Sequence, residues 1–275
     1  MAKLRSVLRR AFHKSGGQRV RIAARRTALR ARAGAFRNEI GVLMHADPAD
    51  SRGVLLAVYR GNLDRSAVAT WRRLVGELRP TVALDVGANY GEVAFSTRYD
   101  GLRELHLVEP NPAVLVRLRA TVERAAADYP RIVLHAGAAS DAPGTARLNF
   151  HEHSGTASLR VPGEHGVAVE CFRLDERIRL HDGESLLFKI DVEGHERAAL
   201  EGMAGLLHGR RTAGICEVMH ADDELLKYLG AGFAVSVLRA GREHRVDTPQ
   251  LRDIIAEARE AGWGDLSKDV VLRSR

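Results

Sequence analysis

Cysteines and long apolar runs are scarce in this chain. Only two cysteines, Cys171 and Cys216, occur among the 275 residues, and two isolated cysteines offer no metal-binding spacing. They favour a reducing compartment, so we expect a cytoplasmic protein. No stretch approaches the run of about 18 apolar residues that a membrane span requires. The N-terminus also lacks the uninterrupted apolar core of a secretory signal.

Acidic residues are absent from residues 1–37, which hold twelve lysines and arginines. Subtracting those twelve charges from the net charge of +7 leaves −5 for the remainder. The body of the protein is therefore mildly acidic, and its basicity belongs to an N-terminal arm. This distribution argues against a nucleic-acid groove across the globular face, so a nucleic-acid partner is not expected.

The arm, residues 1–37, has a helical pattern. One face is apolar, comprising Leu4, Val7, Leu8, Ala11 and Phe12. Residues 15–17 interrupt this face, and a weaker stripe resumes at Val20. A basic amphipathic helix on an anionic membrane, an organelle transit peptide, and a solvated or oligomer-forming helix pair all have this pattern. Membrane association and oligomerisation therefore stay open.

Residues 38–80 are predicted to be a lead-in. Two apolar runs, 40–44 and 54–59, are strand-like and are separated by turn-forming residues, which predicts a hairpin. A helical face over 68–75 follows and ends before Pro80.

Seven residues, 85–91 (DVGANYG), organise the rest of the chain. They follow the apolar run 82–84 and precede 92–99, which is predicted to form the first turns of a helix. A glycine-rich turn between a strand and a helix lets a ligand approach bare backbone and the free N–H groups of the helix. A dinucleotide fingerprint would need a glycine where Asn89 stands. An ammonium and a carboxylate, as on the methionine end of S-adenosylmethionine (SAM), suit Asp85 and this turn better.

The acid Glu109 ends the predicted strand 104–108 and lies 18 residues after Gly91. An acid in this position grips ribose hydroxyls in nucleotide-binding βαβ units. Asn111 and Pro112 then predict a helix start. After a third strand, the small residues 137–141 offer a surface on which an adenine ring could rest.

Strand and helix patterns alternate from residue 81 to the end. The further predicted strands are 131–135, 146–150, 167–173, 185–190, 213–219, 233–238 and 269–272, and the helices are 198–207, 223–229 and 249–261. Such alternation predicts an α/β domain over 81–275, with a mostly parallel sheet covered by helices on both faces.

A second group of polar residues closes the strands 185–190 and 213–219. Lys189 interrupts an otherwise apolar strand, and a buried lysine is costly unless it is paired, although it could instead extend to a surface carboxylate. Asp191 and His195 follow the first of these strands, while the second carries Glu217 and is followed by His220. Charges at the carboxyl ends of parallel strands lie where open α/β sheets bind ligands.

At these motifs the chain resembles the FkbM family of SAM-dependent methyltransferases. The resemblance covers about residues 40–275 and rests on LDVGANYGEVAFS (84–96), LVEPNP (107–112), AASD (138–141), FKIDVEGHERAALEGM (188–203) and CEVMH (216–220). It implies a Rossmann-like, seven-stranded fold with one antiparallel strand. It also implies SAM as methyl donor and O-methylation of a sugar, glycan or polyketide-type hydroxyl. The arm has no counterpart in these motifs.

The resemblance also assigns residues to the cofactor. The methionine end would be held by Asp85, Gly87, Asn89 and Gly91; the ribose by Glu109, next to Asn111; and the adenine by Ala138, Ala139 and Ser140. Asp191 would face the reactive centre.

Methyl transfer from a sulfonium needs an aligned acceptor, and an alcohol acceptor needs a base that removes its proton. His195 and His220 are the candidate bases, with Asp191, Glu217 and Lys189 beside them. In an alternative mechanism Asp191 and Glu217 bind Mg²⁺, which acidifies the acceptor. The histidine base is preferred, so no metal is predicted.

Two other functions remain as alternatives. One is a non-catalytic SAM-binding scaffold, against which the full set of acids and histidines argues. The other is an RNA-directed methyltransferase that uses the basic arm. No Asn-Pro-Pro-aromatic motif follows the strand 185–190, so methylation of a base nitrogen is not expected.

Overall fold

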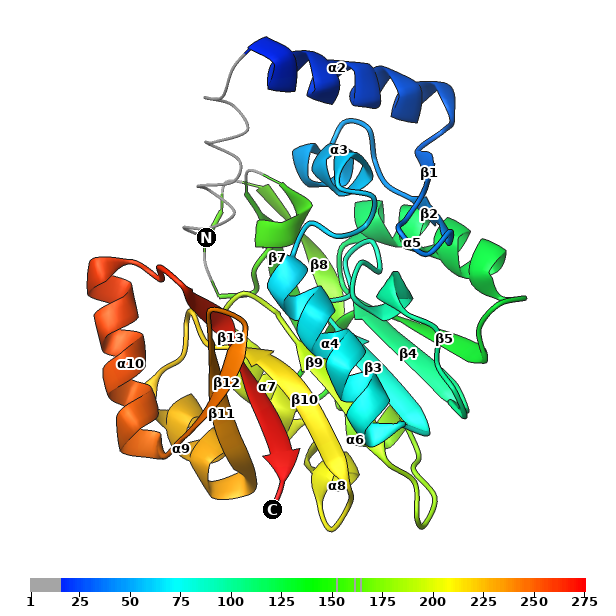
Figure 1. Ribbon diagram of the computed structural model, residues 1–275. Helices are drawn as coiled ribbons and strands as arrows, with labels where there is room; N and C mark the ends of the chain where they lie inside the picture. Colours follow the sequence, from blue (N-terminus) through cyan, green and yellow to red (C-terminus); the bar gives the residue numbers. More distant parts are fainter. Residues whose placement is uncertain (1–15, 152, 161, 164) are drawn as a thin grey trace.

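The computed structural model describes residues 16–151, 153–160, 162–163 and 165–275. Its centre is an eight-stranded sheet of order β12-β11-β13-β10-β9-β3-β4-β5 (Figure 1). The strands β10, β9, β3, β4 and β5 run parallel to one another. Their bounds are β3 Val82–Val86, β4 Glu104–Glu109, β5 Arg131–Ala136, β9 Leu186–Ile190 and β10 Thr212–Glu217. All carboxyl ends of these strands therefore meet at one edge.

The antiparallel part of the sheet lies beside β10. β13 (Leu266–Ser274) pairs antiparallel with both β10 and β11 (Phe233–Arg239). The predicted mostly parallel α/β sheet is thus confirmed, and one further strand, β12 (Arg242–Val246), extends it beyond seven. β12 is polar and mostly exposed at the sheet edge, so its sequence carries no apolar alternation.

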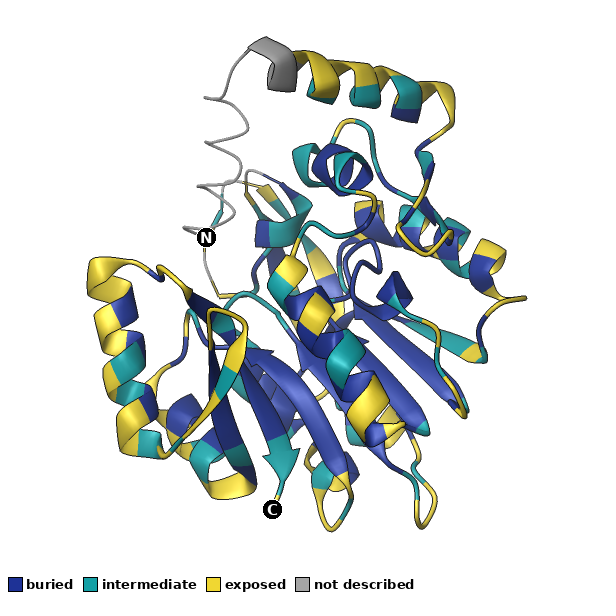
Figure 2. Cartoon of the chain, in the orientation of Figure 1, coloured by how far each residue is buried: buried dark blue, intermediate teal, exposed yellow. Residues whose placement is uncertain are grey.

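Helices cover both faces of this sheet. α4 (Arg65–Leu78) and α5 (Pro112–Ala125) pack on one face, and α6 (Leu174–Arg177), α7 (Glu196–Glu201), α8 (Ala204–Leu207), α9 (Asp223–Gly232) and α10 (Thr248–Ala261) pack on the other. Successive side chains of a strand point to opposite faces, so in β3 Ala83 joins one core while Leu84 joins the other. The central strands β3 and β9 are buried on both sides, as Figure 2 shows by the dark blue colour at the middle of the sheet.

A second, three-stranded sheet of order β6-β8-β7 lies beside the carboxyl edge of the main sheet. It is built from β6 (Ala138–Ala139), β7 (Gly144–Phe150) and β8 (His165–Phe172). The short helix η2 (Ser154–Thr156) lies in the connection between β7 and β8.

The described part of the arm packs against the body. α2 (Gly16–Ala31) lies over α3 (Ser51–Val58) at the top of Figure 1. Leu29 is only 2% exposed and belongs to the same core as Ala83, which we call the main core. The predicted interruption at residues 15–17 is wrong for Gly16 and Gly17, which belong to α2. The apolar face from Leu4 to Phe12 lies outside the described residues.

The hairpin after α2 is formed by β1 (Ala35–Arg37) and β2 (Leu43–His45). This hairpin therefore crosses the predicted boundary between residues 37 and 38. The second predicted strand of the lead-in, 54–59, is wrong, because α3 (Ser51–Val58) occupies it. Asp50 accepts the N–H groups of Arg52 and Gly53 and so caps a helix. The run after it is buried all round, and such a run does not distinguish a strand from a helix.

The helix predicted over 92–99 is also wrong, since only the 3₁₀ turn η1 (Ala94–Ser96) forms there. Its carbonyl groups accept hydrogen bonds from side chains of the lead-in instead of from later residues of a helix. Asn38 Nδ2 donates to the oxygen of Phe95 at 2.7 Å, and Arg72 Nε donates to that of Ser96 at 2.9 Å. The next residue, Thr97, is already in an extended conformation. Among the described residues, no helix is both long and apolar enough to cross a membrane.

Candidate active site

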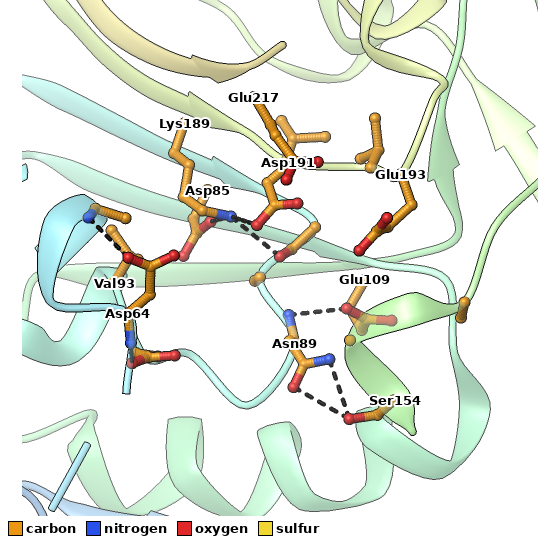
Figure 3. Close-up of a pocket in the computed structure, with 18 of the residues that line it drawn as sticks. Asp64, Asp85, Asn89, Val93, Glu109, Ser154, Lys189, Asp191, Glu193 and Glu217 are labelled. Atoms are coloured by element: carbon orange, nitrogen blue, oxygen red, sulfur yellow. Dashed lines mark hydrogen bonds and ion pairs between the residues drawn. The ribbon is translucent and has the colours of Figure 1, made fainter. Parts of the chain in front are cut away.

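A cavity of about 390 Å³ lies at the carboxyl edge of the main sheet. Its walls come from the ends of β3, β4, β9 and β10, from the start of α4, and from β6 and η2. Figure 3 shows Glu109, Asn89 and Ser154 gathered at one end, and Lys189, Asp191 and Glu217 at the other.

The glycine turn lets the tips of β3 and β9 approach each other. Gly87 has φ +76°, and a Cβ there would lie 2.0 Å from the carbonyl oxygen of Asp191. Only glycine avoids that collision. Asn89, at φ +49°, lines the cavity, whereas Gly91, at φ +83°, does not and instead packs against the ring of Phe95.

The backbone N–H groups of this turn are already bonded within the protein. Gly87 and Ala88 both donate to the carbonyl of Val108 at 3.0 Å, and Asn89 donates to Glu109. The prediction that free N–H groups of a helix follow the turn is wrong, because only η1 forms there and the turn is tied to β4.

Glu109 is 5% exposed and is held by two backbone donors. Its Oε2 accepts the N–H of Asn89 and its Oε1 accepts that of Asn111, both at 2.8 Å. Burial raises the pKa of Glu109 to about 7, although these two N–H groups lower it. Asn111 does not line the cavity; its side chain caps α5 by accepting the N–H of Ala113. One lone pair on each oxygen of Glu109 remains for a ligand.

Lys189 lies directly opposite Asp85 in the register of β9 and β3. Its Nζ is 3.5 Å from Asp85 Oδ1 and 3.3 Å from Asp191 Oδ2, as Figure 3 shows. Burial lowers the pKa of Lys189, but the charges of Asp191 and Asp85 outweigh it and raise that pKa. Lys189 is therefore a buried ammonium that is paired with two carboxylates. One of them is Asp85, the acid that the sequence suggests as the partner of a ligand's ammonium group.

Four carboxylates lie at the tips of β9, β10 and β13. Asp191 and Glu193 follow β9, Glu217 ends β10, and Asp269 lies opposite Glu217 in the register with β13. All four line the cavity. Burial, followed by the charges of Asp191 and Glu193, raises the pKa of Glu217 well above its ordinary value.

His195 also lines the cavity. Ser140 Oγ donates to Asp141 Oδ1 at 2.9 Å, so it accepts from His195 Nε2 at 3.1 Å. That assignment leaves Nδ1 unprotonated, and among the described residues Nδ1 has no hydrogen-bond partner. Burial and the charge of Arg160 lower the pKa of His195, so its ring is neutral at pH 7. Ser140 itself does not line the cavity, whereas Ala138 and Ala139 do.

His220, the other candidate base, does not line this cavity. Its Nε2 lies 3.4 Å from Glu193 Oε2, and it borders a smaller neighbouring cavity of about 140 Å³. The hydrogen bond with Glu193 raises its pKa.

Several cavity residues carried no recognisable signal in the sequence. Arg52, whose side chain is 15% exposed, pairs with Glu92 at 3.0 Å and donates to Asn89 Oδ1 at 3.3 Å. Arg52 lies between the two apolar runs of the lead-in, at the start of α3, a helix that the sequence does not predict. Ser154, from the polar stretch after β7, hydrogen-bonds Asn89 at 3.3 Å. Asp269 joins the site only through the antiparallel pairing of β13 with β10.

Three solved structures to which the chain is similar are methyltransferases. One from Geobacter sulfurreducens is 13% identical with a TM-score of 0.41, over 100% of this chain and 96% of that one. An O-methyltransferase from Bacillus cereus in complex with SAH is 12% identical, with a TM-score of 0.42 over 77% and 80%. Precorrin-6y C5,15-methyltransferase from Geobacter metallireducens is 12% identical, with a TM-score of 0.40 over 75% and 87%.

No curated protein sequence matches the chain significantly. The methyltransferase FkbM domain, in contrast, matches residues 85–262, which is more than half of the 275 residues and includes the glycine turn, Glu109 and the acids after β9 and on β10. The chain therefore belongs to the FkbM methyltransferase family.

Proposed function

We propose that the protein transfers a methyl group from SAM to a hydroxyl group of a sugar, glycan or polyketide-type small molecule. Its membership of a methyltransferase family supports the reaction class. The choice of oxygen as the acceptor rests on one observation. A neutral histidine lines the same cavity as Asp191 and Glu217, and its unprotonated nitrogen has no hydrogen-bond partner within the part of the chain that the structure describes.

The cavity offers groups that fit each part of SAM. Glu109 keeps lone pairs for the ribose hydroxyls, and Ala138 and Ala139 offer a flat surface for adenine. The methionine end would lie at Asn89, where Arg52 supplies a cation for its carboxylate. SAM supplies an electrophilic methyl group on its sulfonium, and the protein aligns the acceptor with it.

His195 Nδ1 is the proposed base. An alcohol is a poor nucleophile until its proton is removed during attack, and a neutral imidazole can accept that proton at pH 7. Ser140 is the positioning residue, because its contact with Nε2 fixes the tautomer that leaves Nδ1 free. The proton thus moves from the acceptor oxygen to Nδ1 as the carbon–oxygen bond forms and the carbon–sulfur bond breaks.

An RNA acceptor is disfavoured by the charge of the site. Eight acidic side chains line the cavity against four lysines and arginines, and the phosphates of a nucleic acid need an excess of lysines and arginines at the contact surface.

The first experiment compares His195→Ala with the wild type. We expect unchanged SAM affinity by calorimetry and a rate of methyl transfer to a panel of hydroxylated small molecules that is about 10²- to 10⁴-fold lower. His208→Ala is the control, since His208 is exposed after α8 and lies outside the cavity. Full activity in His195→Ala would exclude this residue as the base.

A further inference from the structure

Three carboxylates at the reactive edge converge on one point. Asp191, Glu193 and Glu217 each offer an oxygen atom, and these oxygens all lie within 4.8 Å of one another. They come from the ends of two neighbouring parallel strands, so the sheet itself fixes their spacing. Figure 3 shows the three side chains grouped at one end of the cavity.

Glu217 supplies an independent observation. It is 8% exposed and lines the cavity, yet its Oε2 is buried and has no hydrogen-bond partner among the described residues. Leaving a buried carboxylate unpaired costs several kcal/mol or shifts it to the neutral form. An unsatisfied acceptor that faces a cavity therefore points to a ligand that it binds.

The nearby basic groups pair with other acids. Lys189 pairs with Asp85 and Asp191, and His220 pairs with Glu193. In the described part of the chain no lysine, arginine or histidine forms an ion pair with Glu217. One of its oxygens lies within 4.8 Å of an oxygen of Asp191 and of Glu193, and Asp269 lies opposite it in the register of β10 and β13. A cation from solution would neutralise this excess of negative charge.

We propose that Asp191, Glu193 and Glu217 bind one divalent cation, Mg²⁺ or Mn²⁺, through one oxygen each. These hard ions prefer carboxylate and water oxygens, and no nitrogen or sulfur ligand is needed. Lys189 holds Asp191 Oδ2 and His220 holds Glu193 Oε2, so each acid keeps its other oxygen for the ion. Such outer contacts orient metal ligands. His220, which lies outside the main cavity, thereby gains a positioning role.

The use of this ion rests on the proposed function. The acceptor hydroxyl would take one of its open positions, and a metal-bound hydroxyl loses its proton more readily. His195 would still take the proton that the hydroxyl loses as its oxygen attacks the methyl carbon and the carbon–sulfur bond breaks. The existence of the ion site does not depend on this reaction.

Mn²⁺ binding to the full chain tests the proposal directly. Free Mn²⁺ is measured by electron paramagnetic resonance in the absence of SAM. We expect one Mn²⁺ per chain and at least about tenfold weaker binding in Glu217→Gln and in Glu193→Gln. Glu257→Gln, an exposed glutamate on α10, should bind as the wild type does. Thermal unfolding checks that each variant folds. If Glu217→Gln does not fold, the Mn²⁺ affinity of Glu193→Gln tests the proposal.

Equal Mn²⁺ affinity in the wild type and in Glu193→Gln would overturn the proposal. Methyl transfer is measured separately, with and without a chelator. Glutamate-dependent Mn²⁺ binding without transfer to any hydroxyl would support the ion site and refute the proposed function. Transfer that a chelator does not affect, together with no Mn²⁺ binding, would leave the function standing and refute the ion site.

Discussion

Glu109 ties the glycine turn to the start of α5 while it keeps acceptor capacity for a ligand. Each of its oxygens already takes one backbone N–H group, at 2.8 Å. The carboxylate therefore cannot rotate freely, and little side-chain entropy remains to be lost when a ribose binds. Its neighbour Asn111 contributes its backbone to this arrangement and uses its side chain only as a helix cap.

Replacing Glu109 by alanine should weaken SAM binding by about tenfold to a hundredfold, since a hydrogen bond to a charged group contributes roughly 1.5–3 kcal/mol. Asn111→Ala is the matched control. It should lower the stability of α5 by about 1 kcal/mol through the lost cap and leave SAM affinity unchanged. Calorimetry measures both affinities. Equal affinity in wild type and Glu109→Ala would remove Glu109 from the cofactor site.

At the scale of elements, α2 connects the basic arm to the core. Leu29 is 2% exposed and belongs to the main core, and Arg25 Nε donates to the carbonyl of Ala57 in α3 at 3.0 Å. On the same helix Val20 is 66% exposed. One face of α2 therefore packs against the body of the protein, and the other face is exposed to solvent.

Leu29→Ala should lower the free energy of unfolding by about 2–5 kcal/mol, as expected for a cavity-forming substitution in a core. Val20→Ala removes a smaller, exposed side chain from the same helix and should change it by less than about 0.5 kcal/mol. Urea denaturation measures both. If Leu29→Ala were as mild as Val20→Ala, α2 would not be part of the cooperative unit.

The sequence predicts the elements whose pattern is local. The alternation after residue 81 places β3, β4 and β9 correctly, because each is a short apolar run followed by a recognisable turn or helix start. It does not predict α3, whose buried run has no periodicity, or η1, whose carbonyls are taken by Asn38 and Arg72 from distant segments. Those outcomes depend on tertiary contacts.

The candidate site likewise contains residues that local motifs predict and contacts that depend on tertiary structure. Lys189, Asp191 and Glu217 lie in motifs that end predicted strands, so the sheet topology alone brings them together. The sequence does not predict that Lys189 pairs with Asp85, because that contact depends on the register of β3 against β9. Nor does it predict that Ser140 contacts His195, since this hydrogen bond joins β6 to the start of α7.

At the scale of the whole molecule, charge is separated. Positive charge is concentrated in the arm, and buried carboxylates are concentrated at the reactive edge of the sheet. Burying acids against a sheet edge lowers the stability of the ligand-free protein, and a bound cofactor or cation restores it by mass action. Function and stability therefore have opposite requirements at this edge.

Because Glu109 is one of these buried acids, its ionisation should make the free energy of unfolding depend on pH. A comparison of the wild type with Glu109→Gln isolates this contribution. The pKa of Glu109 is about 7 in the folded protein and near the ordinary 4.5 when unfolded, so between these values the folded state binds more protons. The free energy of unfolding therefore falls as the pH rises through this window. Relative to Glu109→Gln, the ligand-free wild type should lose roughly 2–3 kcal/mol between about pH 5 and about pH 8.5. Urea denaturation at the two pH values measures the difference, and Glu257→Gln should differ from the wild type equally at both. Parallel curves for wild type and Glu109→Gln would mean that Glu109 ionises as an ordinary surface acid.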